Sequence, residues 1–428
     1  MLALAGFSTI LLVLFAILSK RVSPLVALIA LPCLAAILLG QSTQLPEYLI
    51  NGITTIAPIA VMFMFAILFF SIMNDAGVFK PFISFTIHIC GNDPRKLFIG
   101  VVLLTSLVHL DGSGASTFLI VIPALLPVFE KLQIDRKILA GLVAMAAGVN
   151  NILPWGGPTI RAAAALEQDV MTLYQPLIPI HLAGLAFVLA TAFWLGTKQL
   201  KLGLVSQQDD TAQQQNSGST VASNWLWYFN LLLILVVLVA IVSSLLPPVI
   251  AFIAGALLAL VFNYPAVNDQ KKAIDDAAKP IFMMVSILFA AGCFTGVLRQ
   301  SGMLEAMAQG GGELLPEALT SYFPLLIAIL SVPLSLLFDP DSFYFGILPV
   351  IAGVATESGL SGTSVAHAAL MGQMTVGFPI SPLTPATFLL VGLARINLAD
   401  HQRFTIPLLF ATSLFMTLVA VLLGVIPL

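Results

Sequence analysis

Long runs of residues without charge alternate with short polar stretches along the whole chain. About 20 apolar residues in a helix cross the roughly 30 Å hydrocarbon core of a bilayer, so the length of each run predicts whether it spans. The run 221–268 is too long for one helix and is predicted to split at Pro247–Pro248 into two spans. The other eight predicted spans lie near residues 2–19, 23–41, 53–74, 138–166, 173–197, 279–298, 363–395 and 405–427.

Two further units are too short to span. The run 97–110 has 14 residues, about 21 Å as a helix, and it meets the polar stretch Asp111–Thr117 before a second short apolar run. The later half repeats this plan around the break Asp339–Ser342. Non-helical backbone at membrane depth is tolerated only inside protein or beside a water-filled cavity. Both units are therefore predicted to be re-entrant hairpins.

The two halves of the chain share one order of features: helices, a hairpin, then a helix broken by Gly or Pro. A shift of 226 residues places Ser116 on Ser342 and Pro123 on Pro349. Residues 198–224, rich in Gln, Ser, Thr and Asp, are typical of a flexible linker. The predicted parts are a first repeat, 1–197, a cytoplasmic linker, 198–224, and a second repeat, 225–428.

Lys and Arg predict the orientation. With ten crossings, Arg299 falls on one side, Arg161 lies inside the membrane, and the rest fall on the other side, which the positive-inside rule makes cytoplasmic. Five crossings per half would invert the second repeat relative to the first, a plan common among secondary transporters. The fold class is thus an all-α multi-pass protein of a cell inner (plasma) membrane. The cytoplasmic set is Lys20, Arg21, Lys80, Arg95, Lys96, Lys131, Arg136, Lys137, Lys198, Lys201, Lys271, Lys272, Lys279, Arg395 and Arg403.

Composition narrows the class of protein further. Of the 428 residues 59% are hydrophobic and only 9% are charged, against about 25% charged in soluble domains. A net charge of -3 without a basic run argues against a nucleic-acid partner. No serine–lysine dyad, zinc-binding His pair or Gly-x-Gly-Asp carboxylate pair stands out, so the sequence argues against an intramembrane enzyme.

Ionisable residues inside a membrane are costly, and function is their default interpretation. The first hairpin tip combines a carboxylate with hydroxyls, a set suited to coupling a cation or a proton. The alternatives are that Asp111 only caps a helix and that Asp339 and Asp341 lie in an outer loop. His109 is interpreted as a satisfied buried histidine rather than a proton relay, and His181 and His401 as interfacial. The candidate coupling residues are Asp111, Ser113, Ser116, Thr117, Asp339, Asp341 and Ser342.

Two broken helices face these tips. Half-helix N-termini carry free N–H groups and a positive dipole end, so they favour an anionic ligand. Arg161 follows the first break, and its planar fork suits a carboxylate; the alternative is an ion pair with Asp111 or a bond to a carbonyl. The candidate substrate residues are Asn151, Trp155, Gly156, Gly157, Thr159, Arg161, Ser381, Thr384 and Thr387.

Several stretches resemble the citrate–divalent-metal:proton symporter family over nearly the whole chain outside the linker. They are Ser19-Lys-Arg-Val-Ser-Pro-Leu-Val-Ala-Leu28, Asp75-Ala-Gly-Val-Phe79, Leu110-Asp-Gly112, Pro154-Trp-Gly-Gly-Pro-Thr159 with Arg161, and Phe343-Tyr-Phe-Gly-Ile-Leu-Pro349. The resemblance implies proton-coupled uptake of citrate as a divalent-metal complex, on a two-hairpin plan. It extends to Asp111, Ser116, Thr117, Trp155 to Thr159, Arg161 and Asp341. One departure is Asp111-Gly-Ser-Gly114, where the family commonly has Asp-Gly-Asp-Gly.

These patterns together predict a secondary active symporter that imports citrate or a related carboxylate with protons by alternating access. No permanently bound cofactor is expected; a divalent metal would travel with the substrate. The leading alternative is a cation:proton antiporter on the same scaffold, and a channel is less compatible with repeated broken helices. Carriers of this architecture are often dimers, so a homodimer is one expectation, although no segment identifies its interface.

Overall fold

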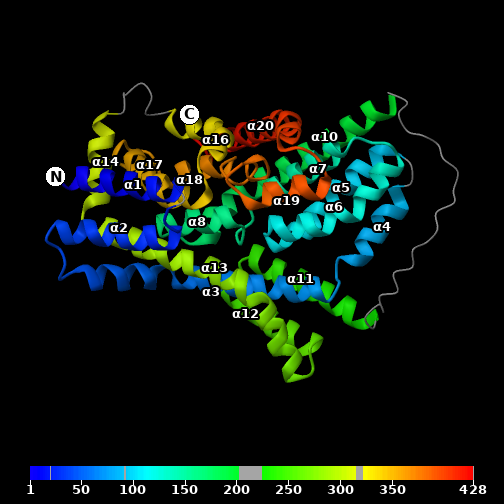
Figure 1. Ribbon diagram of the computed structural model, residues 1–428, viewed down its shortest axis with the longest axis horizontal. Coiled ribbons are helices and arrows are strands. Elements are labelled where there is room, and N and C mark those ends of the chain that lie inside the picture. Colours follow the sequence, from blue (N-terminus) through cyan, green and yellow to red (C-terminus); the bar gives the residue numbers. More distant parts are fainter. Residues whose placement is uncertain (20, 91–92, 202–223, 315–321, 428) are drawn as a thin grey trace.

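The computed structural model describes residues 1–428 except 20, 91–92, 202–223, 315–321 and 428, and the described part is built from helices (Figure 1). Almost all of the predicted linker therefore lies outside the described residues. The first half contains α1 (Leu2–Leu18), α2 (Pro24–Leu38), α3 (Leu45–Asp75), α4 (Lys80–Cys90), α5 (Pro94–Val108), η1 (His109–Asp111), α6 (Gly114–Lys131), α7 (Arg136–Asn150), α8 (Gly157–Leu166), α9 (Val170–Tyr174), η2 (Gln175–Leu177) and α10 (Ile178–Lys201). The second half contains α11 (Asn224–Val242), α12 (Pro248–Asn263), α13 (Val267–Gln300), α14 (Met303–Leu314), α16 (Phe323–Leu337), η3 (Ser342–Ile347), α17 (Leu348–Glu357), α18 (Gly362–Leu370), η4 (Phe378–Ile380), α19 (Pro385–Ala394) and α20 (Leu398–Leu422).

The same order of elements occurs twice. In each half two apolar helices precede a long helix (α3 or α13), a short connecting helix (α4 or α14), a hairpin, a broken helix and a final long helix. The predicted interruption at Pro247–Pro248 is confirmed, since α11 ends before it and α12 begins at Pro248. The inverted relation of the halves across a membrane stays a prediction.

Six helices of the described part are long and apolar enough to cross a membrane by themselves: α3, α6, α10, α11, α13 and α20. The other predicted spans are shorter single helices or broken pairs. Sequence patterns missed α4 and α14, whose short length fits no span, and they placed the starts of α3 and α13 too late. They also made α6 too short, because its first turn consists of the polar residues assigned to the break.

The long helices α3 and α13 lie side by side and form the lower part of the view in Figure 1. Glycines allow their close contact: a Cβ on Gly52 would lie 2.0 Å from the Gly292 carbonyl oxygen, and one on Gly296 would lie 2.6 Å from the Tyr48 carbonyl oxygen. Small residues at helix crossings are the usual means of bringing backbones together in membranes. The backbones of α3 and α13 are therefore packed closely against each other.

The hairpins and broken helices occupy the remaining part of the molecule. In Figure 1 the first hairpin, α5 and α6, lies at the right, whereas α17 of the second lies at the left. The half-helices α8 and α18 lie at the left, and α7 and α19 at the right. We call residues 109–113 tip 1 and 338–341 tip 2; residues 151–156 form break 1 and residues 371–384 form break 2.

Candidate functional site

Break 1 is a tight turn held by its own backbone and one hydroxyl. Gly156 precedes α8, and a Cβ there would lie 2.3 Å from the Asn151 carbonyl oxygen, so a side chain does not fit. The Thr159 hydroxyl, fully buried in the first turn of α8, donates to the Ile152 carbonyl at 2.9 Å. Thr159 therefore fixes the shape of the break and leaves the N–H groups at the start of α8 directed toward it.

Break 2 is held in the same way. The hydroxyls of Thr384 and Thr387 donate to the Phe378 carbonyl at 3.0 and 2.9 Å. The Ser381 hydroxyl accepts a bond from the Leu383 N–H at 3.2 Å. These three predicted substrate residues are all buried and are engaged with the local backbone. Their present contacts position the start of α19.

The two breaks touch each other in the interior. The Asn151 amide donates to the Met374 carbonyl at 2.8 Å. Gly148, one turn earlier in α7, lies against the backbone of Val376, where a Cβ would come within 2.9 Å. The Asn151 bond joins residues that are 223 positions apart in the sequence. The structure therefore brings the two breaks into direct contact.

Tip 1 is an ordered turn. The Asp111 carboxylate accepts bonds from the Ser113 N–H, at 2.8 Å, and from the Ser116 hydroxyl. Gly112 takes a left-handed conformation, with φ 68°, and Ser113 is the residue that caps α6. Asp111 is thus not the helix cap that the sequence allowed as an alternative. Asp111 is half-buried, and the bonds that its carboxylate accepts from Ser113 and Ser116 stabilise the turn.

Trp155 connects tip 1 to break 1. Its indole N–H donates to the Leu110 carbonyl at 2.7 Å, and its ring packs against Phe252 and Phe70, with ring centroids 5.3 and 6.1 Å away. Trp155 therefore links tip 1 and break 1 to the helices α3 and α12, which carry Phe70 and Phe252.

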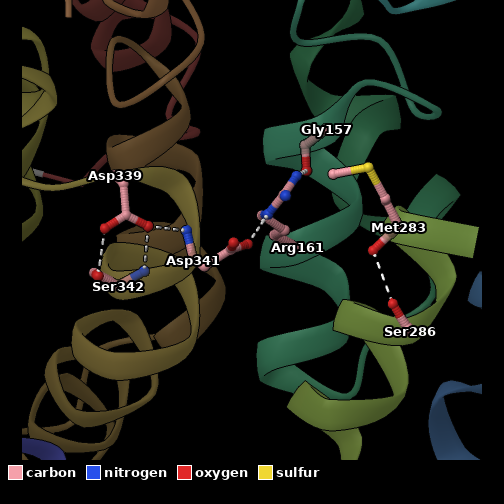
Figure 2. A network of polar contacts seen from close by, with 7 residues as sticks. All are labelled: Gly157, Arg161, Met283, Ser286, Asp339, Asp341 and Ser342. Atoms are coloured by element: carbon pink, nitrogen blue, oxygen red, sulfur yellow. Dashed lines mark hydrogen bonds and ion pairs between the residues drawn. The ribbon is translucent and has the colours of Figure 1, made fainter. Parts of the chain in front are cut away.

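Tip 2 resembles tip 1 in its chemistry. The Asp339 carboxylate accepts bonds from the N–H groups of Asp341 and Ser342, at 3.0 and 3.1 Å, and from the Ser342 hydroxyl at 2.5 Å (Figure 2). Ser342 and Ser116 are the residues that the 226-residue shift superposes, and each binds the aspartate of its own tip. Asp341 is buried within the protein, whereas Asp339 is half-buried.

An ion pair joins α8 to tip 2. The Arg161 Nε donates to Asp341 Oδ1 at 2.7 Å, and Nη1 donates to the Gly157 carbonyl at 3.2 Å (Figure 2). The Arg161 and Asp341 side chains are only 8% and 11% exposed. The sequence had allowed an ion pair or a carbonyl contact for this guanidinium. The structure has both, but the carboxylate belongs to Asp341 rather than Asp111.

A cavity of about 990 Å³ opens beside this pair. Four predicted site residues line it: Arg161, Asp339, Asp341 and Thr384. Sequence patterns missed Arg21, which reaches the cavity from the connection between α1 and α2 and was counted only as a cytoplasmic charge. The sequence feature that could have indicated Arg21 is its position in the Ser19–Leu28 stretch, which resembles the family. Tip 1 is not among the residues that line this cavity.

Two histidine predictions were wrong. His181 and His401 are buried rather than interfacial: His181 bonds the Tyr174 hydroxyl at 2.9 Å, and His401 donates to the Pro379 carbonyl at 2.9 Å. His401 thus supports the backbone of break 2, whereas His181 contacts the side chains of Tyr174 and Asn150. Among the described residues no group of three or more His, Cys, Asp or Glu is arranged to hold a metal ion.

Comparisons with known proteins agree with this architecture. The Alcanivorax borkumensis YdaH transporter has a TM-score of 0.62 at 16% identity, covering 90% of this chain and 88% of its own. Neisseria gonorrhoeae MtrF has a TM-score of 0.60 at 12% identity, covering 90% and 84%. These two likenesses show that the fold is one used by membrane transporters.

Sequence relatives define the family. A Bacillus subtilis (strain 168) citrate transporter is 40% identical over 427 residues, covering 100% of both chains. A Mg(2+)/citrate complex secondary transporter of the same organism is 35% identical over 431 residues, covering 100% of this chain and 99% of its own. The family model described as citrate transporter matches residues 11–377. The chain is therefore a multi-pass membrane transporter rather than an enzyme, and it belongs to the citrate transporter family.

Proposed function

We propose that this transporter imports citrate, as a complex with a divalent cation, together with protons across a cell inner membrane. The observation that carries the proposal is the cavity beside tip 2, which presents a guanidinium and two carboxylates to one solvent-accessible space. A metal–citrate complex has matching groups, namely free carboxylates and a hard cation. The Mg(2+)/citrate relative supports this choice of substrate.

Arg161 would hold a citrate carboxylate. Its Nε and Nη1 already donate to Asp341 and Gly157, whereas Nη2 makes no hydrogen bond within the described residues. A guanidinium has five N–H donors in a planar fork, so Arg161 can bind a substrate carboxylate without breaking its existing bonds. One turn before Arg161, the start of α8 adds N–H groups and the positive end of a helix dipole.

Asp339 and Asp341 would face the cation of the complex. Carboxylate oxygens are ligands that Mg²⁺ and Ca²⁺ prefer, and both carboxylates line the cavity. The metal also neutralises part of the citrate charge, which lowers the cost of taking the substrate out of water. In this proposal the metal is cargo.

Alternating access is supported by the unequal cavities at the two ends, about 990 Å³ beside tip 2 and about 210 Å³ beside Arg299. The larger cavity is bordered by Arg21–Pro24, which the positive-inside rule makes cytoplasmic. On the opposite side Arg299 of α13 binds Glu167 at 2.5 Å, and Gln168 donates to Thr363 at 2.8 Å. We therefore assign this conformation to an inward-open state whose outer contacts must separate for substrate to enter.

The two five-crossing repeats, 1–197 and 225–428, would provide the symmetry for this exchange, with 198–224 as their cytoplasmic linker. Proton coupling is assigned to tip 1, whose Asp111 follows Leu110, the residue whose carbonyl accepts a bond from Trp155 of break 1. Replacing Asp111 with Asn is expected to abolish proton-driven uptake while the protein remains folded. A homodimer would fit the architecture.

The deciding experiment is uptake of labelled citrate by proteoliposomes under an inward proton gradient, without metal and with Mg²⁺, Ca²⁺ or Zn²⁺. Metal-dependent accumulation that collapses with a protonophore is the expected result. Arg161→Gln should lose uptake, whereas Arg395→Gln, an exposed arginine 67% accessible, should not. Uptake that ignores metal would replace the complex with free carboxylate as substrate.

The antiporter alternative predicts a different result in the same vesicles. Proton movement would then follow an opposing cation gradient in the absence of citrate. The cavity favours the symporter, because a buried guanidinium repels a bare cation.

A further inference from the structure

His109 is the first residue of tip 1 and is completely buried. Its Nδ1 lies 2.8 Å from the Thr117 hydroxyl oxygen. Its Nε2 has no hydrogen-bond partner among the described residues, although the Asn151 side-chain amide lies near it. That amide instead donates to the Met374 carbonyl at 2.8 Å. Buried polar atoms without a partner are rare in native proteins, so this nitrogen calls for an explanation.

The Thr117 hydroxyl has one proton and two possible acceptors at 2.8 Å, the Ser113 carbonyl and His109 Nδ1. If the proton goes to Ser113, the Thr117 oxygen accepts from His109, the imidazole proton is on Nδ1, and Nε2 carries a lone pair that can bind a proton. If the proton goes to Nδ1, Nε2–H is a buried donor without an acceptor, and orphaned buried N–H groups are the rarer case. The first arrangement is therefore favoured.

The place of His109 links the parts that must move together. Its ring stacks on Phe378 of break 2, with centroids 6.1 Å apart and planes 19° apart, and it precedes Asp111 by two residues. The ionisable groups near it are His181 of α10 and, two residues further along the same tip, Asp111. The helices packed against tip 1 (α3, α5, α6 and α7) carry their charged residues only in their terminal turns.

A buried polar chain leads toward this site from the start of α10. The Tyr174 hydroxyl contacts His181 Nδ1 at 2.9 Å, and His181 Nε2 contacts the Asn150 side-chain oxygen at 3.3 Å. The Asn150 amide donates to the Ser106 hydroxyl at 3.0 Å. Ser106 lies one helical turn before His109. Polar groups thus continue from the side predicted to face outward to within one turn of the imidazole.

We propose that His109 Nε2 is a proton-binding site of this carrier and links protonation of tip 1 to break 2. The site takes one proton from water on the outer side, becomes an imidazolium that keeps its Nδ1–H bond to Thr117, and releases the proton to the cytoplasm. Burial disfavours an isolated imidazolium, so protonation depends on a compensating change around the ring. Phe378, which stacks on the ring, belongs to break 2, and Thr384 of the same break lines the substrate cavity. A movement of break 2 is therefore what couples proton and substrate. The inference rests on the proposed proton-coupled function.

The test compares His109→Gln with His88→Gln, an exposed histidine that serves as control. Two assays are needed: citrate counterflow, which exchanges substrate without a gradient, and accumulation driven by an inward proton gradient. His109→Gln should retain counterflow, lose driven accumulation and lose the pH dependence of uptake. His88→Gln should match wild type in both assays. Driven accumulation by His109→Gln with the wild-type pH profile would overturn the inference.

A binding measurement separates this inference from the proposed function. Purified protein in weak buffer is mixed with Mg²⁺–citrate while a pH indicator reports proton uptake. Wild type should bind one more proton per substrate than His109→Gln does, and equal uptake by the two would refute the site. If wild-type accumulation itself ignores the proton gradient, the proposed coupling fails instead.

Thr117→Val decides the matter should His109→Gln not purify as a folded protein. Valine has nearly the shape of threonine but cannot accept the Nδ1–H bond, so the imidazole loses the contact that fixes its tautomer. The pH midpoint of driven uptake should shift. An unchanged midpoint would count against the site.

Discussion

The pair formed by Arg161 and Asp341 permits a quantitative test of what holds tip 2 against α8. The two groups are 2.7 Å apart, and their side chains are 8% and 11% exposed. Three variants separate the contributions: Arg161→Gln, Asp341→Asn and the double replacement. Each single change leaves one buried charge without its partner, whereas the double change leaves two neutral amides.

Removing one partner of a buried ion pair costs about 3–5 kcal/mol. The lower end, about 3 kcal/mol, applies here because both groups border a water-accessible cavity. At about 2 °C per kcal/mol or less for a chain of this length, each single variant should melt roughly 6 °C lower at most. The double variant should lose only about 1 kcal/mol, because two amides can keep a neutral hydrogen bond.

Thermal unfolding of detergent-purified protein, followed by size-exclusion chromatography of the soluble fraction, measures these shifts. Arg299→Gln is the control, since its pair with Glu167 is more exposed, at 45% and 17%, and should contribute less than about 1 kcal/mol. Citrate uptake is measured on the same variants. The double variant should recover stability but not uptake, because only Arg161 is proposed to hold the substrate carboxylate.

Two results would refute this reasoning. If the losses of the single variants simply add in the double variant, then the two groups do not interact as the structure has them. If the double variant transports citrate like wild type, Arg161 is a structural residue and the proposed function loses its carboxylate ligand.

Three further predictions concern parts away from this pair. Glu167→Arg should slow citrate uptake by disrupting the outer contact, and the swapped pair Glu167→Arg with Arg299→Glu should restore the rate; a swapped pair no faster than the single variant would contradict this. Gly52→Ala should destabilise the crossing of α3 and α13 by about 1–3 kcal/mol in thermal unfolding, whereas Gly392→Ala, with open space around it, should cost nothing; equal melting of the two would be the contrary result. Thr159→Val should cost about 1 kcal/mol and reduce uptake because it removes the bond to the break, while Thr159→Ser should keep both; wild-type behaviour of the valine variant would make the bond dispensable.

Sequence alone was sufficient for most of the apolar helices and for the kinds of residue at their interruptions, but not for the short helices α4 and α14. Apolar run length is set by bilayer thickness, so the runs marked the helices, and the polar stretches at Asp111 and Asp339 marked both tips. Glycine and proline act locally on the backbone, so Pro154 to Pro158 marked the first break without knowledge of the fold. Local rules gave less at helix ends, because the polar first turns of α3 and α13 carry no apolar signal.

Only the tertiary structure decided which of these residues meet. Arg161 pairs with a carboxylate 180 positions away, that of Asp341, whereas the carboxylate considered from the sequence was Asp111. The burial of His181, the place of Arg21 in the cavity and the unpaired nitrogen of His109 likewise depend on neighbours from distant segments. Residue type and hydrophobic pattern report what a segment can do in a bilayer, whereas contacts across the two halves are fixed by helix packing, which no local pattern records.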